Sequence, residues 1–236
     1  MDQEPRTKRT VPDGPKEKKL KDFKAVIFDM DGVIFDSERC IMETWVALAE
    51  KYGIEGIEEV FLACTGTNHE KTRRIVLDAY GDDFPYEQYE HESSVMYHEK
   101  YDGGKLPIKP GVFELLDYLK SIGVKIALAS STRRASVIRM LTEGGMIDYF
   151  DEIVAGDMVT KSKPDPQIYL TACEAIGVAP EDCYAIEDSY NGIRSAAAGK
   201  LRPIMIPDLR PADDEMKELS VVVLDTLNDV ITYLSE

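Results

Sequence analysis

The sequence predicts an α/β protein in which a doubly wound parallel sheet carries an inserted all-helical cap domain. Short, continuous apolar runs recur along the chain, and amphipathic segments with helical spacing alternate with them. A long stretch of helical periodicity, residues 37–105, interrupts this alternation once. Strand–helix alternation is typical of a Rossmann-like sheet, and a connection that long is expected to fold as a subdomain of its own. The 236 residues, 44% of them hydrophobic, suffice for one substantial domain and a smaller insertion.

The expected strands are apolar runs without polar alternation. The first, residues 24–28, reads Lys-Ala-Val-Ile-Phe and ends before Asp29. Continuous hydrophobicity is typical of strands that are buried on both faces, as in a parallel sheet. The further runs that share this property are residues 124–129, 153–155, 184–186 and 203–206.

The segments between these runs carry helix start and stop signals. Asp165-Pro166 has the chemistry of a helix start, and Gly177 is placed to end the same helix. Ser189 is expected to cap a further helix that runs to Gly199. Another helix, followed by Gly123, is indicated by the apolar face Val112, Leu115, Leu116, Leu119 and Ile122.

The insertion is expected to act as a lid over the active site. It holds two apolar stripes at helical spacing, Ile41, Trp45, Leu48 and Tyr52 in one and Tyr86, Tyr89, Met96 and Tyr97 in the other. Because it begins just beyond Asp31, it is expected over the carboxyl ends of the strands, where open α/β sheets place their sites. The predicted organisation is a flexible tail at 1–22, a catalytic core at 23–36 and 106–236, and a cap at 37–105.

Composition restricts the partners and the compartment. The net charge of −16 argues against a protein that coats nucleic acid or binds an anionic membrane. No apolar stretch approaches the ~20 residues that span a bilayer, and no hydrophobic leader of the secretory type is present. The four cysteines are widely scattered and are expected to be reduced thiols of a cytoplasmic protein. A monomer is the default expectation.

The strongest chemical signal is the pair of carboxylates in Asp29-Met-Asp31-Gly32. Two acids two residues apart at the end of an extended strand point to the same side, and Gly32 permits a sharp turn after them. One carboxylate can bind Mg²⁺ and attack phosphorus, while the other gives a proton to the leaving group and later takes one from water. An ordinary acidic turn after a strand has the same spacing, so the pair alone does not decide the chemistry.

Three further clusters complete a set for phosphoryl transfer. The turn that holds Ser130, Ser131 and Arg133 offers hydroxyl and backbone N–H groups to an anion. Lys163 lies in a proline-stiffened loop, where a fixed ammonium neutralises phosphoryl oxygens. The adjacent acids Glu187 and Asp188 are hard oxygen ligands suited to Mg²⁺. Together the clusters supply a nucleophile, an acid–base group, a cation and a metal site.

The run from Phe28 to Glu38, Phe-Asp-Met-Asp-Gly-Val-Ile-Phe-Asp-Ser-Glu, resembles the first motif of the haloacid dehalogenase superfamily. Ser130, Lys163-Pro164 and Glu187-Asp188 resemble its second, third and fourth motifs in order and spacing. The resemblance extends from about residue 23 to the end of the chain. It is strongest to the β-phosphoglucomutase-like phosphatases, which carry a C1-type helical cap.

This resemblance implies a role for each matched residue. Asp29 is expected to be the nucleophile and a Mg²⁺ ligand, and Asp31 the acid–base group that also offers its carbonyl to the metal. Ser130 and Lys163 are expected to hold the phosphoryl group. Asp188 completes the metal site, with Glu187 reaching the metal directly or through water. Substrate contacts are expected from Ser131, Arg133, Gly66 and His69.

Two positions depart from the mutases of that subgroup. The cap loop has His69 where the mutases carry an arginine for a second phosphate, and Ile41 stands where they carry a histidine. Hydrolysis of a small phosphate monoester, such as a sugar, polyol or nucleoside phosphate, is therefore the preferred interpretation. A phosphomutase and a sensor that binds a phosphometabolite without turnover are the alternatives.

Overall fold

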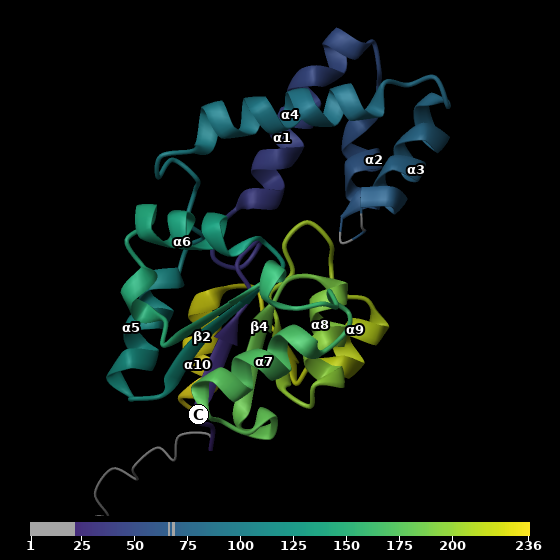
Figure 1. Ribbon diagram of the computed structural model, residues 1–236. Helices are drawn as coiled ribbons and strands as arrows, with labels where there is room; N and C mark the ends of the chain where they lie inside the picture. The colour runs from purple at the N-terminus through teal and green to yellow at the C-terminus, as the bar shows by residue number, and fades with distance from the viewer. Residues whose placement is uncertain (1–21, 66, 68) are drawn as a thin grey trace, which may run out of the picture.

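The core of the protein is a six-stranded, fully parallel sheet (Figure 1). The computed structural model describes residues 22–65, 67 and 69–236, so the predicted tail at 1–22 lies almost wholly outside the described residues. The strands follow the spatial order β3-β2-β1-β4-β5-β6. Their bounds are β1 Ala25–Phe28, β2 Lys125–Ser130, β3 Glu152–Ala155, β4 Cys183–Glu187, β5 Arg202–Met205 and β6 Val222–Val223. The five expected strands are present, and β6 is an addition.

The register of the central strands brings their chemical groups to one edge. Phe28, the last residue of β1, pairs with Leu128 of β2 on one side and with Ile186 of β4 on the other. The residues that follow these three positions therefore lie side by side at the carboxyl end of the sheet. The sequence clusters after the first, second and fourth strands converge for this reason.

Helices cover both faces of the sheet, because successive residues of a strand point to opposite sides. Val26 and Phe28 pack with α5, α6 and α10, whereas Ala25 and Ile27 pack with α7 and α8 (Figure 1). Ser189 caps α8 as expected, since its Oγ accepts the backbone N–H of Gly192 at 3.0 Å. The helices of this part are α5 Val112–Ser121, α6 Arg134–Glu143, α7 Gln167–Ile176, α8 Tyr190–Ala198, α9 Asp214–Leu219 and α10 Leu227–Leu234, with short 3-10 helices at Ile147–Tyr149, Gly156–Met158 and Pro180–Asp182.

Four helices form the inserted unit, with a hydrophobic cluster of its own above the carboxyl end of the sheet (Figure 1). They are α1 Ser37–Tyr52, α2 Ile57–Cys64, α3 His69–Tyr80 and α4 Tyr86–Tyr101. Trp45 and Tyr89 lie at the centre with their rings edge to face, and the Tyr89 hydroxyl donates to the Trp45 carbonyl at 2.5 Å. Among the described residues, no helix combines the length and apolarity needed to cross a membrane.

Candidate active site

The side chain of Lys163 connects three strand ends. Its Nζ donates to Asp29 Oδ1 at 2.6 Å, to Glu187 Oε1 at 2.6 Å and to the Ala129 carbonyl at 3.0 Å. The lysine side chain is only 7% exposed, so these charge-assisted bonds form in a low-dielectric setting. Burial lowers the pKa of Lys163, but the carboxylates of Asp29 and Glu187 raise it further, and the net direction is upward. The ammonium therefore stays charged.

Glu187 is fixed from several sides and is completely buried. Tyr169 donates its hydroxyl to Glu187 Oε1 at 2.7 Å, and Ser189 Oγ donates to Oε2 at 2.9 Å. A side chain at Gly192 would place its Cβ 1.9 Å from the Glu187 Cδ, so only glycine fits beneath this carboxylate. The position of Glu187 is thus set by backbone packing as well as by hydrogen bonds.

The side chain of Asp188 packs closely against the turn after the first strand. At Gly32 a Cβ would lie 2.2 Å from Asp188 Oδ2, and the φ angle of Gly32 is +78°. That left-handed conformation and the close approach both require glycine. The turn expected from Gly32 is therefore present, and it makes room for the acid from the neighbouring strand.

The acids at this edge fit a divalent cation. Carboxylate oxygens of Asp29, Glu187 and Asp188 all lie within 4.8 Å of one another. Burial, assisted by neighbouring carboxylates, raises the pKa of Asp29 to about 8 even though Lys163 opposes the shift. Burial also raises the pKa of Asp188 well above its usual value. A bound cation favours the charged forms of carboxyl groups, so it would stabilise this cluster of hard oxygen donors, in which the pKa values of Asp29 and Asp188 are raised.

Asp31 is oriented apart from this cluster. Its Oδ1 accepts the Ser37 hydroxyl at 2.9 Å, and its Oδ2 accepts the Thr132 hydroxyl at 2.8 Å. Ser37 begins the first cap helix and Thr132 follows β2, so both parts of the fold position this carboxyl. Neither hydroxyl was predicted from the sequence to have a role in the site. The sequence did contain an indication for Thr132, because it belongs to the predicted anion-binding turn that holds Ser130 and Ser131.

The predicted residues of that turn have different surroundings. Ser130 is fully buried, and its Oγ accepts the backbone N–H of Thr132 at 3.1 Å. Ser131 lines a cavity of about 990 Å³ that contains Asp29 and Lys163. Arg133 is the exposed N-cap residue of α6 and is not among the residues that line this cavity within the described chain.

The cavity extends from the acidic cluster to the cap. On the cap side the described residues that line it include Thr65, Thr67 and Lys71 but not His69. His69 Nε2 lies 3.0 Å from Glu90 Oε2, and the imidazole is 61% exposed. Gly66 lies outside the described residues. The predicted role of this segment in substrate binding stays a prediction, and Lys71, two positions beyond the histidine, is a cavity-lining residue that was not predicted.

Glu38 is a further residue of the cavity that sequence reasoning left without a role. Burial, with contributions from Asp31 and Asp208, raises the pKa of Glu38 to about 7. It adds a carboxyl group on α1 that faces the same space as Asp188. Its position at the end of the first motif was the only sequence signal for it.

The class of protein follows from this arrangement. A parallel sheet carries an aspartate pair, a lysine and a second acidic pair at its carboxyl edge, and an inserted helical unit lies above them. These features define a capped α/β enzyme. The family follows from comparison with known proteins. The chain belongs to the haloacid dehalogenase-like hydrolases, because the model of that family matches residues 23–200.

Individual relatives include a phosphatase and a mutase. The phosphorylated carbohydrates phosphatase of Thermotoga maritima is 34% identical over 185 residues, which cover 77% of this chain and 84% of that protein. The beta-phosphoglucomutase of Bacillus subtilis is 32% identical over 217 residues, which cover 88% and 95%. The structure of CbbY from Rhodobacter sphaeroides in complex with phosphate is similar with a TM-score of 0.69 and 26% identity, covering 88% of this chain and 96% of that one.

Proposed function

We propose that the chain is a magnesium-dependent phosphatase that hydrolyses a small phosphate monoester through a phosphoaspartate on Asp29. The observation that carries this proposal is the contact of Asp29 with the Lys163 ammonium at 2.6 Å, inside a cavity that also contains Asp31. One carboxyl is held by a cation for attack and the other by hydroxyls for proton transfer. Such a division of roles between two acids supports covalent phosphoryl transfer.

In the first step, an Asp29 oxygen attacks phosphorus and the bond to the leaving oxygen breaks. Asp31 gives its proton to that oxygen, so the leaving group departs as a neutral alcohol. Lys163 offsets negative charge on the phosphoryl oxygens. Ser131, at the wall of the cavity, is positioned to offer hydrogen bonds to the same group.

In the second step, water attacks the phosphorus and the bond to Asp29 breaks. Asp31, now ionised, takes the proton of the attacking water and returns to its starting state. Inorganic phosphate and the alcohol are the products. Asp29, Glu187 and Asp188 would hold Mg²⁺, which supplies charge neutralisation at the phosphoryl oxygens when it is bound.

Two observations favour hydrolysis over the mutase alternative. Ile41, which lines the cavity, cannot exchange a proton with a sugar hydroxyl. His69 is paired with Glu90 and is not among the described residues that line the cavity. The similarity to a carbohydrate phosphatase and to a structure with bound phosphate supports a small phosphorylated metabolite as substrate. A cytoplasmic monomer is part of the proposal; the four cysteines are free and buried, which fits a reducing compartment.

The test is phosphate release from a panel of glycerol, sugar and nucleoside monophosphates with Mg²⁺. EDTA and the variant Asp29→Asn serve as controls, and circular dichroism checks that the variant is folded. Metal-dependent release that is lost in the variant supports the proposal. Turnover by folded Asp29→Asn at the wild-type rate would contradict the covalent mechanism.

The alternatives have their own signatures in the same experiment. A mutase releases no phosphate but converts a sugar monophosphate to its isomer when a sugar bisphosphate is added. A sensor binds a phosphate ester, measured by calorimetry, and releases nothing under either condition.

A further inference from the structure

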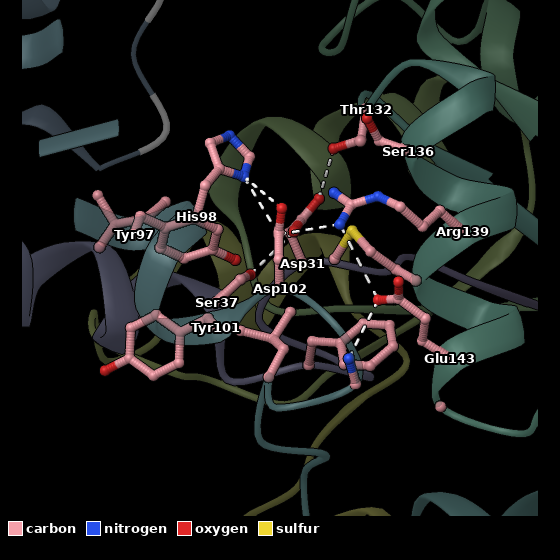
Figure 2. Close-up of a pocket in the computed structure, with 16 residues that line it drawn as sticks. Asp31, Ser37, Tyr97, His98, Tyr101, Asp102, Thr132, Ser136, Arg139 and Glu143 are labelled. Carbon is pink, nitrogen blue, oxygen red and sulfur yellow. Dashed lines mark hydrogen bonds and ion pairs between the residues drawn. The ribbon is translucent and has the colours of Figure 1, made fainter. Parts of the chain in front are cut away.

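A second, smaller cavity of about 180 Å³ lies beside the first, between the end of α4 and the helix α6 (Figure 2). The carboxyl of Asp31 belongs to the lining of both cavities. Its two hydroxyl partners, Ser37 and Thr132, are shared in the same way. The proposed acid–base group therefore stands at the boundary between the two spaces.

The charges of the smaller cavity exclude an anionic ligand. Its guanidinium, on Arg139, donates to Asp102 Oδ1 at 2.9 Å and lies 3.9 Å from Glu143 Oε2 (Figure 2). His98 Nδ1 lies 3.1 Å from the same Asp102 oxygen. With Asp31 included, three carboxylates face one guanidinium and one imidazole. A second phosphate or a carboxylate would meet net negative charge here, because the positive charge of Arg139 is already matched.

Neutral polar groups and apolar walls make up the rest of the lining. The hydroxyls of Tyr97 and Ser136 lie on opposite walls (Figure 2). Burial, together with the charge of Asp31, raises the pKa of Tyr97, so its hydroxyl stays neutral and able to donate. Phe35 and Met140 supply apolar surface. Donors and acceptors that alternate with apolar patches match a carbon chain bearing hydroxyl groups, since each hydroxyl both donates and accepts.

The volume limits the length of such a chain. An engineered apolar cavity of about 150 Å³ holds benzene, which has six non-hydrogen atoms. The smaller cavity of this protein, about 180 Å³, therefore accommodates a molecule of roughly six non-hydrogen atoms. Glycerol and similar short polyols have this number of non-hydrogen atoms. A whole sugar ring exceeds it.

We propose that this cavity is a leaving-group subsite for the uncharged, hydroxylated carbon chain of a short polyol phosphate. This rests on the proposed function. The phosphoryl group lies with Asp29 and Lys163 in the larger cavity, and the ester oxygen lies at Asp31. The carbon chain then extends between Tyr97 and Ser136, where it displaces water and is enclosed by the cap.

The experiment compares two substrates in two matched variants of α6. Ser136→Leu fills the cavity, whereas Thr142→Leu adds the same side chain at an exposed position of the same helix. Glycerol phosphate is the test substrate. The reference is p-nitrophenyl phosphate, whose aromatic leaving group is too large for the cavity. Ser136→Leu is expected to lower kcat/KM for glycerol phosphate by about tenfold or more, with p-nitrophenyl phosphate within about twofold and Thr142→Leu unchanged.

A second variant keeps the proposal testable if Ser136→Leu does not fold. Tyr97→Phe removes one hydroxyl and is expected to raise KM for glycerol phosphate by about fivefold, again without effect on the reference. Equal losses for both substrates, or no loss for glycerol phosphate, would overturn the subsite. A wild-type preference for bisphosphates over glycerol phosphate would overturn it as well. Absence of turnover with every ester, the reference included, would instead contradict the proposed function on which the subsite depends.

Discussion

The Lys163 ammonium lies 2.6 Å from Oε1 of Glu187, a carboxylate with no exposed surface. Glu187 is the last residue of β4, and it gives the lysine a second carboxylate partner besides Asp29, the proposed nucleophile. Because the same ammonium bonds Asp29, the lysine transmits the rigid position of Glu187 to the reacting carboxyl. Glu187 is therefore a positioning residue for Asp29 as well as a candidate metal ligand.

Replacement of this lysine tests that relationship. Lys163→Met is expected to lower kcat by at least about 100-fold, because the phosphoryl oxygens lose their fixed cation. It also leaves buried carboxylates unpaired, which costs about 3 kcal/mol of unfolding free energy. Steady-state kinetics and urea denaturation measure the two effects. Lys161→Met, an exposed neighbour in the same loop, is the control and should change neither by much.

The close packing under Glu187 makes Gly192 a sensitive position. Gly192→Ala places a methyl group 1.9 Å from the Glu187 Cδ, so the carboxylate must move or the helix must shift. We expect loss of most activity and destabilisation by about 2–4 kcal/mol. Gly199→Ala in the same region is the control, since its nearest neighbour is the flexible end of Leu201 at 3.0 Å. Equal behaviour of the two variants in thermal unfolding and turnover would refute the packing argument.

The sequence was sufficient for five of the six strands and for the convergence of the residues at their carboxyl ends. Continuous apolar runs mark strands buried on both faces, and parallel pairing then brings Asp29 and Glu187 to one edge without further information. The two-residue strand β6 (Val222–Val223) was too short to leave such a pattern. The hydrophobic pattern of a long buried strand can be read from its own residues, whereas a two-residue edge strand forms only through its pairing with the neighbouring strand.

Side-chain facing in the cap could not be predicted in the same way. His69 was expected in a cap loop, but it is the first residue of α3, and its imidazole pairs with Glu90 on α4, a residue far from it in sequence. Tyr97 was expected in an apolar stripe, yet it lines the smaller cavity. Both outcomes depend on how the cap helices pack against one another and against the core, which helical periodicity does not specify.

The raised pKa of Asp29 predicts a pH-dependent stability in metal-free protein. Burial raises this pKa to about 8, far above the value of about 3.9 for an unfolded chain. The folded state therefore holds the proton more tightly. The stability that this group contributes is full below about pH 4 and is lost as the pH rises through about 8. In EDTA, the Tm of the wild type should fall relative to that of Asp29→Asn by about 4 °C or more between pH 5 and pH 7.

Added Mg²⁺ should reverse this trend, since a cation binds the deprotonated carboxylate. Its stabilisation of the wild type, measured as a shift in Tm, is expected to be larger at pH 8 than at pH 6. If the Tm of the wild type and the Tm of Asp29→Asn changed with pH in the same way, both in EDTA and in Mg²⁺, the raised pKa could not be assigned to Asp29.

An ion pair at the connection between cap and core is the last position that we expect to be sensitive. Lys109 Nζ lies 2.6 Å from Asp208 Oδ1, and the Asp208 side chain is only 3% exposed. Lys109→Met leaves this carboxylate buried without its close partner, so unfolding should become easier by about 2–4 kcal/mol. Lys109→Met combined with Asp208→Asn should recover part of that loss, because the unpaired charge is removed too. Urea denaturation of Lys109→Met, Asp208→Asn and the double variant measures the coupling energy between the two residues, with the exposed Lys105→Met as control. A double variant that is as unstable as the sum of the single variants would show that the two residues act independently.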